Sequence, residues 1–353
     1  MAQYDLKAVA NTLRREEVRA RSGGMWRWRE VLPLLDAACR FSLGEGDTPL
    51  LRLERIGGEL GLRDIFLKDE GLNPTGSFKA RGLAMAVSKA IELGAKGFVI
   101  PTAGNAGGAL AAYAARAHVP AHVFMPADAR GVYQLEVKAA GGELHLVEGL
   151  IDEAGRQAAS FADEHGYMNL ATFREPFRVE GKKTMGYELA EHFEWSLPEV
   201  IIYPTGGGTG LVGMWKAFQE LEELGWVVGE RPRMISVQSE GCAPVVRAME
   251  RGEDRIEYWQ NAATRAEGLR VPGVFADVEV LASLRESGGT ALAVSEEEIE
   301  AAQKKLAQEE GVSASKEGAA PLAGLIQLVG QKLIGMEERI VLFNTATGLK
   351  DVD

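Results

Sequence analysis

The chain has 353 residues, of which 46% are hydrophobic and 25% are charged, which is enough for two soluble domains with a sizeable core. A formal net charge of −12 argues against a nucleic-acid-binding protein, because such a protein needs a basic face. The N-terminus lacks an apolar signal region and no apolar run approaches the roughly 20 residues that cross a bilayer, so we expect no membrane contact and a cytoplasmic location.

The first 45 residues are charged and helical in pattern, with an aromatic patch at Trp26 and Trp28. We interpret them as an extension that packs on the body or reaches a partner subunit. Two strands follow, at 48–51 and 65–68, joined by a loop. Further helices are expected at 80–93, 105–117, 132–140, 152–165, 184–193, 210–224, 296–310 and 319–333. Further strands are expected at 97–101, 121–125, 143–147, 200–204, 234–238 and 340–343.

Strands that alternate with helices of this length indicate right-handed crossovers and parallel sheets. The fold class is therefore α/β, with two three-layer domains of parallel or mixed sheets and a cleft between them. We expect three parts. Residues 1–45 form an N-terminal extension packing on the body, residues 46–72 with 181–353 form a large domain, and residues 73–180 form a small domain. Two distant cysteines, and histidines without metal-ligand spacing on one helix face, predict no disulfide framework and no metal site.

A glycine-rich turn at 203–210 follows an apolar strand and opens a helix. Its backbone amides can point at one spot, where the helix dipole also favours an anion. The turn has no P-loop lysine, and no G-x-G-x-x-G frame with an acidic ribose-binding residue. A cofactor with one small phosphate suits it best, although a tight strand–helix turn without a ligand stays an alternative.

Three more segments carry polar groups at comparable positions. Lys79 lies behind the glycine- and hydroxyl-rich turn 73–78, and a lysine against a carbonyl cofactor can form a Schiff base. The turn 102–108 joins a strand to a helix and can hold a carboxylate on its amides. The segment 344–351 follows the last strand, where open α/β sheets bind ligands. Taken alone, each could be an ordinary surface lysine, a helix cap or a loop.

The run 73–82, Asn-Pro-Thr-Gly-Ser-Phe-Lys-Ala-Arg-Gly, resembles the lysine motif of the pyridoxal-phosphate enzymes that share the tryptophan synthase β-subunit fold. The resemblance extends from about Gly44 to the end of the chain and places the cofactor in the cleft between the two domains. Within that group the chain is most similar to the threonine synthase family, through residues 25–46, 204–217 and 348–351. The resemblance implies a homodimer that converts O-phospho-L-homoserine and water to L-threonine and phosphate.

The resemblance also implies residue roles. Lys79 forms the Schiff base with pyridoxal 5'-phosphate and then moves protons, Asn105 hydrogen-bonds the ring hydroxyl, and Thr345 faces the pyridine nitrogen. The cofactor phosphate is held by Gly206, Gly207, Gly208, Thr209 and Gly210. The substrate carboxylate is held by Thr102, Ala103, Gly104, Asn105 and Ala106. The substrate phosphate is recognised near Arg178, to which Arg174 and Lys182 can contribute.

Two departures from the threonine synthase pattern keep another reaction open. Ala80 stands where an aspartate is usual, and the stretch 172–178 lacks an Asn-Ser pair. The alternative is a serine/threonine dehydratase or another β-eliminating amino-acid lyase. A relative without catalysis and a nucleotide-binding oxidoreductase are further alternatives. The retained Lys79 argues against the relative without catalysis.

Overall fold

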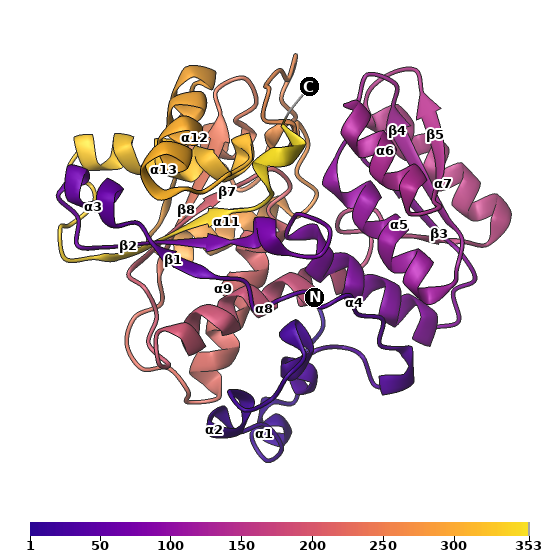
Figure 1. Ribbon diagram of the computed structural model, residues 1–353, viewed down its shortest axis with the longest axis horizontal. Helices are drawn as coiled ribbons and strands as arrows, with labels where there is room; N and C mark the ends of the chain where they lie inside the picture. The colour runs from indigo at the N-terminus through magenta and orange to yellow at the C-terminus, as the bar shows by residue number, and fades with distance from the viewer. Residues whose placement is uncertain (352–353) are drawn as a thin grey trace. The chain divides into compact units, whose positions relative to one another are not determined.

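The computed structural model describes residues 1–351 and divides them into two compact units. Unit 1 comprises residues 1–47 and 73–184, and unit 2 comprises residues 48–72 and the chain from residue 185 onward. The N-terminal 47 residues thus belong to the same unit as residues 73–184. The predicted large domain ends at residue 353, and its last two residues lie outside the described part. Figure 1 labels the helices and strands of both units.

Unit 1 contains a four-stranded, fully parallel sheet in the order β5-β4-β3-β6. Its strands are β3 (Phe98–Pro101), β4 (Ala121–Pro126), β5 (Glu143–Val147) and β6 (Met168–Asn169). Successive side chains of β3 enter different clusters: Phe98 and Ile100 join a large core, and Val99 joins a smaller one. This alternation means that helices cover both faces of the sheet.

The helices of unit 1 complete three layers around that sheet (Figure 1). They are α4 (Lys79–Glu92), α5 (Asn105–Ala117), α6 (Gly131–Ala139) and α7 (Ile151–His165). Buried residues of α4, α5 and α6 form the large core, whereas the alanines of α7 form the smaller one on the opposite face. A last helix, α8 (Phe177–His192), begins in unit 1 and continues into unit 2.

The N-terminal segment of unit 1 forms short helical turns that pack on α4 and α5. These are α1 (Leu6–Val9), α2 (Arg15–Val18), η1 (Gly24–Val31) and η2 (Ala37–Cys39). Trp26 belongs to the large core, and Trp28 is fully buried. The buried carboxylate of Glu45 accepts hydrogen bonds from Trp26 Nε1 and from the Tyr113 hydroxyl, the latter at 2.6 Å. Burial also raises the pKa of Tyr113, which keeps that hydroxyl a donor.

Unit 2 contains a six-stranded mixed sheet in the order β1-β2-β10-β7-β8-β9, in which only β1 is antiparallel to its neighbour. Its strands are β1 (Leu50–Arg52), β2 (Asp64–Asp69), β7 (Val200–Pro204), β8 (Arg233–Ser239), β9 (Thr290–Val294) and β10 (Arg339–Asn344). The α/β fold class with two sheets is therefore confirmed.

The helices of unit 2 lie on both faces of its sheet. They are α3 (Glu54–Leu60), α9 (Thr209–Glu223), α10 (Pro244–Arg251), α11 (Asp277–Glu286), α12 (Glu296–Glu310) and α13 (Lys316–Gly330). Buried residues of α3, α12 and α13 share one core with Val200 and Ile202 of β7. Across the sheet the chain moves from β7 to β8 to β9 and then returns to β10, which neighbours β7. Right-handed crossovers therefore put α9 to α11 on the face opposite to α12 and α13.

Some elements differ from the expected ones. The loop expected between the first two strands is mostly the helix α3, whose two internal glycines conceal the helical pattern. Helix α8 begins at Phe177, seven residues before the expected start, because its first turns are buried although charged. The helix expected at 296–310 is confirmed as α12, with Ser295 as its N-cap and Glu298 completing the capping box. None of the helices in the described part is both long and apolar enough to span a bilayer.

Candidate active site

Lys79 is the first residue of α4 and follows a tight turn in unit 1. Gly76 adopts a left-handed conformation with φ of 64°, and its N–H donates to the Asn73 carbonyl at 2.7 Å. The hydroxyl of Ser77 is buried and has no hydrogen-bond partner among the described residues. Lys79 itself is half-buried, and its Nζ lies 4.4 Å from the ring centroid of Phe78. The turn thus presents an amine at a helix start, on an aromatic support.

Lys182 approaches the same aromatic ring from α8. Its Nζ lies 4.8 Å from the centroid of Phe78, and the side chain is fully buried. Burial lowers the pKa of Lys182 well below its ordinary value, and the positive charges of Lys79 and Arg178 lower it further. Glu175 acts in the opposite direction, and its own pKa is raised by burial. Three basic side chains, those of Lys79, Arg178 and Lys182, therefore lie close together with the carboxyl group of Glu175 beside them.

Arg178 is held at the start of α8 by its own segment. Its Nη1 donates to the Leu170 carbonyl at 2.9 Å and to the Thr172 hydroxyl at 3.2 Å, and its N–H donates to Glu175 Oε2 at 3.0 Å. Its Nε is buried without a hydrogen-bond partner among the described residues. Burial lowers the pKa of the guanidinium. One donor of this buried cation is therefore left for a ligand.

The second turn of unit 1 joins β3 to α5 and contains the residues 102–106. Thr102 Oγ1 accepts from the Gly104 N–H at 3.1 Å and donates to the Gly104 carbonyl at 3.3 Å, which closes the turn. Asn105 is the first residue of α5 and is half-buried. Ala103 and Ala106 belong to the same turn and add no polar group beyond the backbone. The N-terminus of a helix is a favourable place for a carboxylate.

The glycine-rich turn of unit 2 joins β7 to α9, and its glycines fit tightly against the protein. A Cβ on Gly206 would lie 2.3 Å from the Gly268 carbonyl oxygen, and one on Gly208 would lie 2.3 Å from Val280 Cγ2. A Cβ on Gly210 would lie 2.0 Å from the Tyr203 hydroxyl. Gly208 is also left-handed, with φ of 78°. Gly207 is the half-exposed member of the turn, and Thr209 begins α9.

Thr345 lies at the same edge of the sheet as this glycine-rich turn. The strands β10 and β7 are parallel neighbours, with Leu342 opposite Ile202. Continuing that register brings Thr345 level with Thr205, where the glycine-rich turn begins. Thr345 is 5% exposed, so its hydroxyl lies within the unit rather than on its surface.

The structure thus gathers the candidate residues into two groups. Unit 1 holds Lys79, Arg178 and Lys182 in one charged cluster and carries the turn 102–106. Unit 2 holds Thr345 and the glycine-rich turn on adjacent strands. Sequence reasoning did not single out Phe78 or Glu175, which the structure places in contact with these cations. Phe78 could have been found from its position beside Lys79, whereas nothing in the sequence indicates that Glu175 is buried.

These residues fit pyridoxal phosphate. The glycine-rich turn offers one phosphate-sized group of amides at the start of α9, without a lysine for further phosphates. The amine of Lys79 is accessible in part, as bonding to an aldehyde requires. Thr345 offers a neutral hydroxyl rather than a carboxylate. Each unit, taken by itself, therefore offers groups that a small phosphorylated carbonyl cofactor needs.

Comparisons with known proteins agree with that fit. The model of the pyridoxal-phosphate dependent enzyme family matches residues 41–346. The threonine synthase of Methanocaldococcus jannaschii is 36% identical over 352 residues, which is 99% of this chain and 86% of that protein. The threonine synthase of Methanosarcina acetivorans is 33% identical over 349 residues, covering 99% and 85%.

Solved structures show the same fold. The threonine deaminase of T.th. is 28% identical with a TM-score of 0.72, covering 85% of this chain and 92% of that one. Maize serine racemase has a TM-score of 0.74 at 22% identity, covering 87% and 88%, which is a likeness of fold alone. The chain belongs to the pyridoxal-phosphate-dependent enzymes and, among them, to the threonine synthase family.

Proposed function

We propose that the protein converts O-phospho-L-homoserine and water to L-threonine and phosphate. The observation that carries the choice of substrate is the buried cation cluster in unit 1. Lys182 is fully buried and Arg178 is 2% exposed, and Lys79 lies near enough to lower the pKa of Lys182. A phosphate dianion offsets such charges, whereas the neutral side chain of serine or threonine does not. The names of the curated relatives, threonine synthase, agree with threonine as the product.

The roles that we propose for the residues are those that the family resemblance implies. Lys79 bonds to the cofactor aldehyde, and the glycine-rich turn with Thr209 binds the cofactor phosphate. Asn105 and Thr345 orient the ring, and the turn 102–106 grips the substrate carboxylate. Arg178 and Lys182 bind the substrate phosphate, and Arg178 offers its remaining Nε–H.

The chemistry then requires proton movement on the substrate. Pyridoxal phosphate, when bound, supplies an electron sink for the bond to Cα. The amine of Lys79 takes the proton at Cα and moves protons at Cβ as phosphate leaves Cγ. Water adds at Cβ and gives the threonine hydroxyl. One water is consumed and one phosphate is released for each threonine formed.

The test is product analysis of the purified holoenzyme with O-phospho-L-homoserine. We expect threonine and phosphate in equal amounts, and no product from Lys79→Ala. Borohydride reduction followed by peptide mapping should label Lys79. A label on another residue would reject the assignment of Lys79, and loss of phosphate without threonine would reject the reaction.

A second candidate is β-elimination from threonine or serine to a 2-oxo acid. Ala80 favours it, and so does the 28% identity with a solved threonine deaminase. The same assay with threonine as substrate separates the two. A 2-oxo acid from threonine, together with no turnover of O-phospho-L-homoserine, would establish this second reaction.

We propose further that the protein is a cytoplasmic homodimer, as the resemblance implies. Trp26 and Trp28 are buried within their own chain, so their rings are not the contact between subunits. Sedimentation of the holoenzyme at several concentrations tests the dimer, and a single species of monomer mass would reject it.

A further inference from the structure

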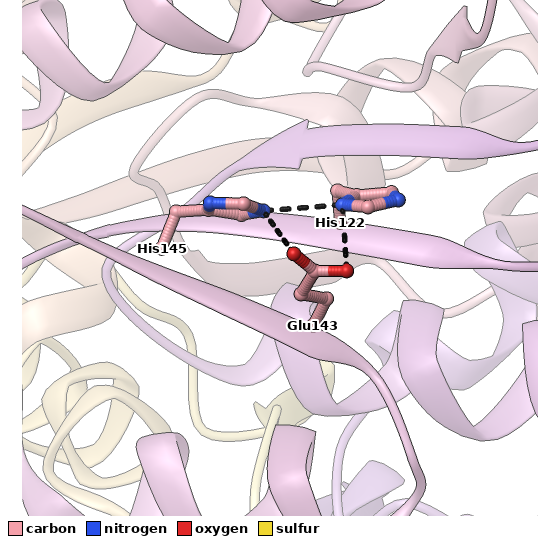
Figure 2. A group of neighbouring side chains, drawn as sticks. All are labelled: His122, Glu143 and His145. Atoms are coloured by element: carbon pink, nitrogen blue, oxygen red, sulfur yellow. Dashed lines mark hydrogen bonds and ion pairs between the residues drawn. The ribbon is translucent and has the colours of Figure 1, made fainter.

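Three side chains outside the proposed active site meet on the sheet of unit 1. His122 lies on β4, and Glu143 and His145 lie on the neighbouring strand β5. The register places His122 directly opposite Glu143, with His145 two residues further along β5 on the same face. Figure 2 shows the two imidazoles and the carboxylate turned toward one another. Because β5 is an edge strand, the group is reached from the rim of the sheet.

The separations of the donor atoms match those of a tetrahedral metal site. His122 Nδ1 lies 3.1 Å from His145 Nε2 and 3.5 Å from a carboxylate oxygen of Glu143. His145 Nε2 lies 3.7 Å from the other carboxylate oxygen. Bonds of about 2.0–2.1 Å at tetrahedral angles put neighbouring ligand atoms about 3.3–3.4 Å apart. One ion can therefore reach all three groups with small side-chain adjustments.

Aromatic packing holds both imidazoles in place. Phe124 stacks on His145 with centroids 4.3 Å apart and an interplanar angle of 8°. Phe161 of α7 lies against His122 with centroids 4.5 Å apart. In Figure 2 the second nitrogen of each ring points away from the group. The two coordinating nitrogens are thus oriented before any ion arrives, which reduces the entropy lost on binding.

Exposure differs among the three ligands in the way an ion-binding site needs. His122 is 8% exposed, His145 is half-buried, and the side chain of Glu143 is 66% exposed. The carboxylate can therefore close over an ion that enters from solvent. A fourth ligand position remains for water, as in zinc sites with three protein ligands.

We propose that His122, Glu143 and His145 bind one zinc ion per chain. Two imidazoles and one carboxylate form a ligand set that zinc accepts in this geometry. The ion would join the edge strand β5 to β4 and so stabilise this edge of unit 1, because binding occurs only in the folded chain. No residue of the proposed active site takes part, so the inference is independent of the proposed function.

The test is calorimetric titration of chelator-treated holoenzyme with zinc chloride. We expect one saturable site per chain in the wild type. Binding should weaken at least about tenfold in His145→Gln and in Glu143→Gln, since each loses a direct ligand. Glu143 is exposed, so its variant folds even if changes at the histidines disturb packing. The matched control is His118→Asn, at an exposed left-handed helix end that asparagine tolerates.

Cobalt gives a second readout that does not depend on activity. Cobalt bound by these ligands should show the intense visible bands of a tetrahedral site, absent in His145→Gln and retained in His118→Asn. No saturable zinc binding to the wild type would overturn the proposal. So would unchanged affinity in both ligand variants, or loss of binding on Cys39→Ser, which would place the ion at that thiol.

Discussion

Two turns with the same local design, one in each unit, use glycine for different reasons. In the turn of unit 2, the protein itself fills the space around Gly206, Gly208 and Gly210, and a Cβ would fall 2.0–2.3 Å from fixed atoms. In the turn of unit 1, a Cβ on Gly104 would meet only the ring of Tyr133 at 3.7 Å, an ordinary contact. Its φ of −162° is available to any residue. Packing therefore requires glycine at positions 206, 208 and 210, and it does not require glycine at position 104.

The comparison distinguishes glycines that packing requires from a glycine in the turn proposed to bind the substrate. Gly206 must be small because the carbonyl of Gly268 lies beside it. Gly268 is held in place because its N–H donates to Glu317 Oε1 at 2.6 Å. Gly104 has no such neighbour, so packing does not explain the glycine at this position. A substrate carboxylate on the amides of residues 102–106 is the proposed occupant. Packing thus explains the glycines of the unit 2 turn, and the proposed carboxylate contact would explain Gly104 in the unit 1 turn.

The largest effect is expected from Gly208→Ala. The substitution combines a left-handed φ with a clash at Val280, and each costs about 1–3 kcal/mol. The free energy of unfolding should fall by about 2–4 kcal/mol, as measured by denaturant titration of the apo and holo forms. Stability equal to that of the wild type would show that this turn is not fixed by packing.

The matching change in unit 1 is Gly104→Ala. The free energy of unfolding should change by less than about 0.5 kcal/mol, because the methyl group makes only an ordinary contact. The KM for O-phospho-L-homoserine should rise at least about tenfold, because we propose that the amides of this turn bind the substrate carboxylate. Steady-state kinetics and thermal unfolding on the same sample check both. A destabilised variant with unchanged KM would reverse the comparison.

Lys182→Met tests the buried cations of unit 1. Burial lowers the pKa of Lys182 in the folded chain below its ordinary 10.5. At pH values between the lowered pKa of the folded chain and 10.5, the unfolded chain carries a proton on Lys182 that the folded chain lacks. The free energy of unfolding therefore rises with pH in this range. The variant should lose this slope and gain about 1 kcal/mol at neutral pH, while KM for the phosphorylated substrate rises.

Denaturant titrations from pH 7 to 10 measure that slope in both proteins. Lys96→Met is the matched control, because Lys96 is exposed. A wild type without the slope, or a variant destabilised at neutral pH, would contradict the assigned direction.

The smallest effect is expected from Thr102→Val. The hydroxyl closes the turn through its bonds to the N–H and the carbonyl of Gly104, and valine keeps the shape without them. A neutral hydrogen bond contributes about 0.5–1.5 kcal/mol, so KM should rise by a factor of about two to ten. An unchanged KM would mean that the turn is held in place without this hydroxyl.

The sequence was sufficient for the α/β fold class, for most helix and strand positions and for the family, because periodicity and motifs are local in the chain. It could not show which glycines packing requires, since Gly268 and Val280 are remote in sequence from the turn that they contact. The group of His122, Glu143 and His145 was also missed, and no metal site was expected. The spacing of the histidines along the sequence indicates no shared helix face, and they meet instead because β4 and β5 pair in this register.

The carboxylate of Glu45 has a consequence for dissecting the chain. The segment shared with the enzyme family begins at residue 41, yet Glu45 accepts the indole N–H of Trp26, which lies ahead of that segment. A fragment trimmed to the shared segment would lose the aromatic cover over α4 and α5 and strip a buried anion of one donor. Residues 1–40 therefore complete the hydrophobic core of the shared segment, and a fragment without them should be less stable than the full chain.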